Sequence, residues 1–176
     1  MRTRNANGFA LIDILFVLAI MGVLCTIALP RLLVARQSAG AASAIGSLRS
    51  LHSAQLTFAL TCGGGFYAPN LTTLGHAPAG SREGFVSANL ATGDSVSRAG
   101  YIIQLEGVAF AGSPGSCNGL GNGSAAQSWH AFADPVSPDN TRHFATNVNG
   151  SIWEHNTTLN GQLPEVGESP VGHLLR

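Results

Sequence analysis

The most pronounced pattern in the chain is a continuous apolar run near its start. Residues 9–29 number 21, and Asp13 is the single charged residue among them. An α-helix rises about 1.5 Å per residue, so the run would be about 30 Å long, the thickness of the hydrocarbon layer of a bilayer. The pattern therefore predicts a membrane-spanning helix over residues 9–29.

Beyond Pro30 the apolar positions become periodic, as on one face of a helix. Because a membrane helix tolerates proline, we expect the helix to continue as an amphipathic segment over residues 30–61 and to stop at the glycines that follow Cys62. The apolar stripe, which should support the rest of the fold, comprises Ala41, Ala44, Ile45, Leu48, Leu51, His52, Gln55 and Ala59. The opposite stripe, which should face solvent or a neighbouring helix, comprises Ser43, Gly46, Ser47, Ser50, Ser53 and Thr57.

Residues 62–176, called the head below, contain short segments typical of β-strands, separated by Gly- and Pro-rich turns. Asn149-Gly150 is a hairpin signal, and the tail from residue 163 should be extended or mobile. The predicted strands are 85–90, 98–110 with an interruption at Gly107, 128–134, 142–148 and 151–154, with a short helical turn at 70–74. This order predicts an α+β fold, in which a long N-terminal membrane-spanning helix packs against a small C-terminal antiparallel β-sheet head.

Two ordinary kinds of N-terminal apolar segment account for the run less well. A secretory signal peptide ends at a cleavage site made of small residues. Here the run ends in Leu-Pro-Arg-Leu-Leu, and the small polar residues stand before it, at residues 5–8. A plain membrane anchor explains the length of the run. It does not explain Asp13, since a carboxylate is costly inside a membrane.

Residues 8–30 resemble the N-terminus of prepilins, the precursors of type IV pilins and of the pseudopilins of type II secretion. The resemblance rests on Gly8 followed by Phe9, a carboxylate at Asp13, and an apolar helix that contains Gly22 and Pro30. The family usually has glutamate where this chain has Asp13, so the charge is kept on a side chain one methylene shorter. Beyond residue 30 the chain is similar to the family only in its predicted architecture.

The resemblance implies processing followed by assembly. A prepilin peptidase would cut after Gly8 and methylate the new N-terminal amine of Phe9. Asp13 would then pair with the amine of another subunit and set the vertical register, while Gly22 and Pro30 would kink the helix. The implied division of the chain is a leader peptide over residues 1–8, a long helix over 9–61 and a globular β-rich head over 62–176.

The resemblance also implies a location and partners. Arginines 2 and 4 before the span balance arginines 31 and 36 after it, so charge does not decide the orientation. Prepilins keep the leader in the cytoplasm, which places this chain in the bacterial inner membrane with its head in the periplasm. It would then enter an extracellular pilus or a periplasmic pseudopilus. Expected partners are further copies of the chain through the N-terminal helices, the peptidase and the pilus or secretion assembly machinery.

Charge is sparse and unevenly distributed. The whole chain is formally neutral and contains no lysine. The head carries four arginines against eight acidic residues, a net charge of −4. A nucleic-acid-binding surface requires a basic patch, so no nucleic-acid partner is expected.

The three cysteines divide by position. Cys25 lies in the apolar run and should be a small buried hydrophobe. Cys62 ends the long helix and Cys117 lies in a Gly/Ser-rich loop. In the oxidising compartment that the resemblance implies, these two are the natural disulfide pair, with two free thiols as the alternative.

Signs of catalysis or metal binding are weak. The six histidines stand at no zinc- or haem-binding spacing, and His52 should make a hydrogen bond beneath the head. Asp134, Asp139 and Asn140 share a turn, and some pseudopilins bind calcium in a C-terminal loop. The spacing is not that of an EF-hand, so ordinary turn formation is the preferred interpretation. No cofactor or metal is expected.

No nucleophile elbow, phosphate-binding loop or pair of catalytic carboxylates is present in the sequence. The prepilin resemblance therefore implies a structural subunit of a helical type IV pilus filament, and the absence of these motifs gives no indication of an enzyme. The first alternative is a pseudopilin of a type II secretion system. The second is a membrane-anchored periplasmic binding module without a polymeric role, which leaves the cleavage motif and Asp13 unexplained.

Overall fold

The computed structural model describes residues 11–175, and the chain separates into two compact units at residue 38. The described part of the first unit is helical throughout. It belongs to helix α1 (Leu11–Thr61), whose last part from residue 39 onward is included in the second unit. The helix continues through Pro30, as the sequence predicts.

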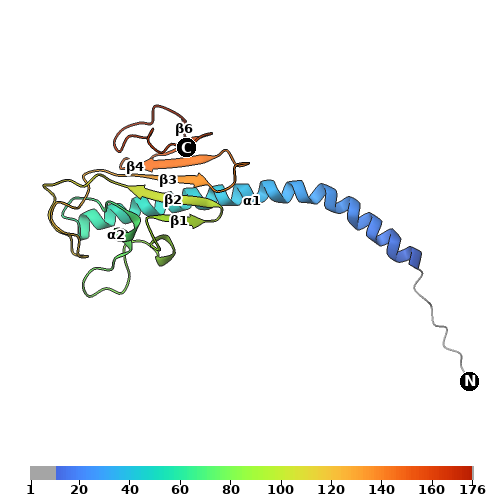
Figure 1. Ribbon diagram of the computed structural model, residues 1–176, viewed down its shortest axis with the longest axis horizontal. Helices are drawn as coiled ribbons and strands as arrows, with labels where there is room; N and C mark the ends of the chain where they lie inside the picture. The colour runs from blue at the N-terminus through green and yellow to red at the C-terminus, as the bar shows by residue number, and fades with distance from the viewer. Residues whose placement is uncertain (1–10, 176) are drawn as a thin grey trace, which may run out of the picture. The chain divides into compact units, whose positions relative to one another are not determined.

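The second unit combines the end of α1 with a six-stranded sheet, in which every strand is antiparallel to its neighbours and the order follows the sequence (Figure 1). The α+β prediction is therefore confirmed. The remaining elements are α2 (Leu71–Gly75), the 3-10 helix η1 (Ala88–Leu90), β1 (Ser95–Arg98), β2 (Tyr101–Glu106), β3 (His130–Pro135), β4 (His143–Asn147), β5 (Ile152–His155) and β6 (His173–Leu174).

One face of α1 forms the base of the main core, much as its periodicity predicts. Six of the eight stripe positions are buried, and Ile45 and His52 are half-buried. Gln55 is buried without cost because its amide donates to the carbonyl of Ala68 at 2.8 Å and accepts from the Ala68 N–H at 2.9 Å. Ser47, predicted to lie on the opposite stripe that faces solvent or a neighbouring helix, is instead buried. Its hydroxyl donates to the carbonyl of Ser43 at 2.9 Å.

The sheet has a core on each face. The face toward α1 buries Tyr101, Ile103, Leu105 and Phe144 in the main cluster. The opposite face buries Phe132, Ala145 and Trp153 beneath Leu159 and Leu163 of the segment that leads to β6. Of the tail from residue 163, which the sequence predicts to be extended or mobile, Leu163 and Val171 pack in this cluster and residues 173–174 form the extended strand β6.

Two of the predicted strands also need correction. Residues 85–90 form no strand and include η1, whose Leu90 is buried. The strand predicted over 98–110 does not start at residue 98. Arg98 is the last residue of β1, Ala99 and Gly100 form a two-residue hairpin turn, and β2 follows from Tyr101. Their φ angles of 51° and 83° are those of a turn that matches the twist of the flanking strands. The hairpin of β4 and β5 around Asn149-Gly150 is confirmed.

Gly40 marks the closest approach of α1 to the β1–β2 turn. A Cβ atom at this position would lie 2.6 Å from the carbonyl oxygen of Ala99. The absence of a side chain therefore lets the helix and the turn pack directly. A glycine that weakens the helix by its own propensity is required here by packing.

The predicted disulfide between Cys62 and Cys117 is confirmed. It joins the end of α1 to the Gly/Ser-rich loop, and the Cys117 N–H also donates to the carbonyl of Cys62 at 3.2 Å. Cys25, expected to be buried, is a free cysteine and is exposed in the part of the chain that the structure describes.

His52 does not make the hydrogen bond that the sequence analysis predicts for it. Its ring packs against buried Trp129, with 5.9 Å between the ring centroids. Its Nδ1 and the Trp129 Nε1 are both buried and lack a hydrogen-bond partner among the described residues. Burial lowers the pKa of His52 below its ordinary value of 6.5, since the charged imidazole loses hydration there.

We therefore expect the free energy of unfolding to fall below about pH 6.5 in part through His52. The unfolded chain binds the proton more readily than the folded chain, so this contribution is complete above the unfolded pKa and is lost as the pH falls through the lower folded pKa. Urea unfolding of the full chain in detergent at pH 7.5 and pH 5 measures this pH-dependent loss. The free energy of unfolding of His52→Gln should differ less between the two pH values than that of wild type. The control His76→Gln, at an exposed histidine, should show the same difference as wild type. An unchanged difference in His52→Gln would contradict the assignment.

Candidate functional site

The most unusual feature of the described chain is the exposed apolar surface of α1. Every residue from 11 to 39 is exposed, and the large hydrophobic side chains from Leu11 to Val34 point outward on all sides of the helix. Even the most covered of them, Ile20, is 45 % exposed, and Leu11 is 74 % exposed. By length and composition this helix could span a membrane. An exposed apolar surface of this extent is typical of regions that contact a membrane or another protein.

Asp13 is the one acidic residue on this surface and lies in the first turn of α1. It is exposed, and none of the ion pairs among residues 11–175 includes it. A carboxylate near the N-terminus of a helix is favoured by the helix dipole. That effect is worth less than the cost of a charge in hydrocarbon, so Asp13 requires a cation once the helix is covered.

The other sequence-predicted positions are placed as follows. Gly22 lies on α1 with no atom within 4 Å of where a Cβ would stand, and Pro30 lies inside the helix. A kink at either residue stays a prediction. Gly8 and Phe9 lie outside the described residues, so the cleavage and methylation site also stays a prediction. Of the predicted sites, the structure brings together only the two cysteines of the disulfide.

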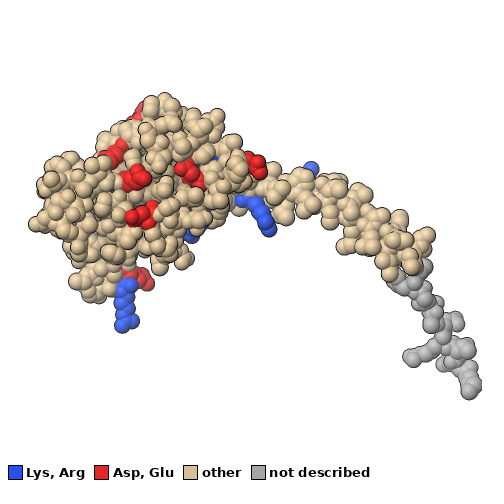
Figure 2. All heavy atoms as spheres, in the orientation of Figure 1, with Lys and Arg blue, Asp and Glu red and all other residues tan. Residues whose placement is uncertain are grey.

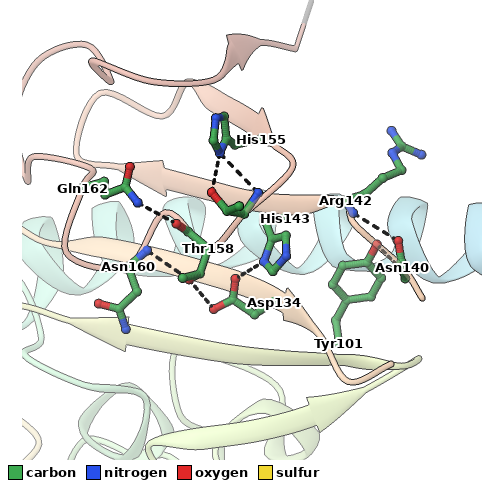
Figure 3. A network of polar contacts seen from close by, with 10 residues as sticks. Tyr101, Asp134, Asn140, Arg142, His143, His155, Thr158, Asn160 and Gln162 are labelled. Atoms are coloured by element: carbon green, nitrogen blue, oxygen red, sulfur yellow. Dashed lines mark hydrogen bonds and ion pairs between the residues drawn. The ribbon is translucent and has the colours of Figure 1, made fainter. Parts of the chain in front are cut away.

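A polar network on the outer face of the sheet was not foreseen as a unit (Figure 3). The carboxylate of Asp134 on β3 accepts from the His143 Nδ1 on β4 at 2.6 Å, and its second oxygen accepts from the hydroxyl of Thr158 at 3.0 Å. His155 bonds through Nδ1 to the hydroxyl of Thr157 at 2.9 Å. The register of β3 and β4 places Asp134 opposite His143, so a correct hairpin assignment would have revealed this pair.

A second charged cluster links the last three strands. The Arg142 guanidinium donates to both carboxylate oxygens of Glu154, at 2.5 and 3.0 Å, and His173 on β6 lies 3.7 Å from the same carboxylate. Hydrogen bonds from Arg142 lower the pKa of Glu154, and they raise the pKa of Arg142 in turn. Burial raises the pKa of nearby Tyr101, whose hydroxyl accepts from the Asn140 amide at 3.0 Å.

These two clusters bind parts of the head to one another. Asp134 uses both carboxylate oxygens on His143 and Thr158, so it fixes the segment after β5 to β3 and β4. Among residues 11–175 no three His, Cys, Asp or Glu side chains are placed to hold a metal ion. Of the turn considered for calcium, Asp139 is exposed and Asn140 is engaged with Tyr101. These contacts are better explained as links that hold the head together than as a catalytic or metal-binding site.

Comparisons with models of known protein families, with curated proteins and with solved structures find no match to this chain. Its function is therefore argued from its own residues. The candidate functional surface is the exposed part of α1, the one large feature of the described chain that a single folded subunit leaves incomplete.

Proposed function

We propose that this chain is a pilin-like structural subunit of a helical type IV pilus filament. A prepilin peptidase would cleave it after Gly8 and methylate Phe9. The mature subunit would wait in the bacterial inner membrane with its head in the periplasm. It would leave the membrane when its helix joins those of earlier subunits, and apolar helix contacts would then replace lipid.

The observation that carries this proposal is the outward-facing apolar surface of α1 with a carboxylate in its first turn. An anchor needs only the apolar surface. A subunit that exchanges lipid for protein also needs a polar group to fix its register, because apolar contacts between helices are weakly directional. Asp13, followed along the helix by a disulfide-linked head, provides this combination.

A pseudopilin of type II secretion remains the first alternative, since it would use the same helix and the same processing. The size of the head and its long loops favour a surface pilus, where exposed loops would meet the cell exterior. A non-polymerising anchored module is the second alternative. It would use α1 only to stay in the membrane, and it would retain residues 1–8.

The experiment is an intact-mass measurement of the protein from the membranes of a bacterium that has a prepilin peptidase. The wild-type chain should lack residues 1–8 and carry one added methyl group. Gly8→Leu should remain a full-length precursor, because the scissile bond would follow a bulky residue. A control, Gly46→Leu, should be processed normally, since its Cβ meets no atom within 4 Å. Wild-type protein that retains Met1 would favour the anchored module.

A further inference from the structure

The charges of the chain are segregated along its length. From residue 14 to residue 61 the charged residues are Arg31, Arg36 and Arg49, all of them basic. From residue 62 to residue 175 there are three arginines against eight acidic residues. The helix segment therefore carries a charge of +3 and this part of the head a charge of −5, and these opposite signs make the helix of one copy electrostatically complementary to the head of another.

The basic side of this pattern is free within one chain. Arg31, Arg36 and Arg49 are exposed, and none of the ion pairs among residues 11–175 includes them. They follow the most apolar part of α1 and lie on the stretch that leads into the head. Each guanidinium can therefore donate to a carboxylate of another chain without first breaking an ion pair among residues 11–175.

The acidic side contains engaged and free carboxylates. Those of Asp94, Asp134, Glu154 and Glu165 accept hydrogen bonds from the head itself. Those of Glu83, Asp139 and Glu168 are exposed and have no hydrogen bond or ion pair among the described residues. Figure 2 shows acidic side chains spread over the visible face of the head.

We propose that the arginines of α1 in one subunit bind the acidic surface of the head of a second copy of this chain. The inference rests on the proposed filament function and names the contact that accompanies helix packing. Exposed ion pairs add little affinity, but complementary potentials steer subunits together and disfavour the wrong register.

A basic helix and an acidic head can pair in two symmetries, of which the proposed filament requires the heterologous one. In an isologous dimer the helix of each copy would contact the head of the other, so no basic or acidic surface would be left free. A heterologous contact places the basic helix against the acidic head and leaves one free surface of each kind on the pair. Such a contact propagates, and when its rotation does not close it generates a helical filament.

The test exchanges the charges in two variants. The helix variant carries Arg31→Glu, Arg36→Glu and Arg49→Glu, and the head variant carries Glu83→Arg, Asp139→Arg and Glu168→Arg. A control variant with Arg31→Lys, Arg36→Lys and Arg49→Lys keeps the charge. Filament yield is measured by shearing and sedimentation for each variant alone and for the two expressed together, beside wild type.

The filament yield of each variant alone should be at most about a tenth of the wild-type yield, because like charges then face each other across the contact. The lysine control should assemble normally. Expressed together, the two variants should recover most of the wild-type yield in mixed filaments, since an acidic helix then meets a basic head and a basic helix meets an acidic head.

Other outcomes overturn the proposal. If the helix variant fails while the head variant assembles and mixing restores nothing, the arginines act elsewhere, and anionic lipid headgroups are the remaining partner. If both variants assemble like wild type, the charges have no role in the contact. Absence of filaments from wild type itself would instead defeat the proposed function, so the two failures are distinguishable.

Discussion

Asp13→Ala is expected to be inserted and processed like wild type, but to enter filaments poorly. Asp13 lies four residues after Phe9 in the sequence, and a helix continued back to Phe9 would place the two about 6 Å apart along its axis at a rise of 1.5 Å per residue. If the chain is cleaved as proposed, the Phe9 amine would be the cation at the matching depth, in the same subunit or in a neighbour. Pairing of the carboxylate with a neighbour's amine would neutralise both charges and fix the vertical register.

The magnitude of the effect follows from the cost of a charge in hydrocarbon. A carboxylate in a membrane segment costs up to about 3 kcal/mol at the centre of the bilayer, and less near its surface. In Asp13→Ala the incoming amine would be left without this partner as the helices close around it, so a loss of filament yield of tenfold or more is expected. Asp13→Glu keeps the charge and should restore entry.

The measurement is the filament yield of the three proteins at equal membrane levels, with intact mass as the check on processing. The competing interpretation is that Asp13 only extends to the headgroups, in which case it has no partner to lose. Assembly of Asp13→Ala at the wild-type level would then be observed. That result would remove the pairing role and leave only the membrane-spanning part of the account.

The second large effect is expected from the disulfide. Cys62 and Cys117 are 55 residues apart in sequence, and closing a loop of that length is credited with about 4 kcal/mol by the chain-entropy model. The loop around Cys117 is rich in glycine and serine, so it has few apolar contacts to replace the bond. Cys117→Ser should therefore lower the free energy of unfolding by several kcal/mol, close to the total stability of a small domain.

Urea unfolding of the full chain in detergent measures this loss, with Cys25→Ser as the matched control because Cys25 is a free thiol. The control should unfold like wild type. Thiol labelling without reductant should modify one cysteine in the native wild-type chain and two in Cys117→Ser. Equal stability of Cys117→Ser and wild type would show that the loop is held by other contacts.

The sequence predicted the parts of the fold that depend on repeating patterns. The apolar stripe of α1 follows a helical period over many turns, so the burial of Leu48 and Leu51 could be read from spacing alone. The hairpin of β4 and β5 carries its own turn signal at Asn149-Gly150. The disulfide was predicted from the oxidising compartment that the prepilin resemblance implies and from the place of Cys25 in the apolar run.

The corrections arise where tertiary packing outweighs local preference. Gly40 weakens a helix in isolation, yet contact with the Ala99 carbonyl requires it. Ser47 is polar but satisfies its hydroxyl within the helix, which allows burial. The segment after β5 contains proline and glycine, yet Leu159 and Leu163 pack on the outer face of the sheet. The pairing of Asp134 with His143 depended on a strand register that no local signal supplied.

The central claim is polymerisation, and the most direct measurement is electron cryo-microscopy of filaments sheared from cells that express this chain. The account predicts helical filaments whose density contains the head with its disulfide and a central bundle of α1 helices, each from a mature chain that starts at Phe9. Asp13 should lie beside an N-terminal amine. Cells that express the full-length chain in their membranes and yield no filament containing it would contradict the account.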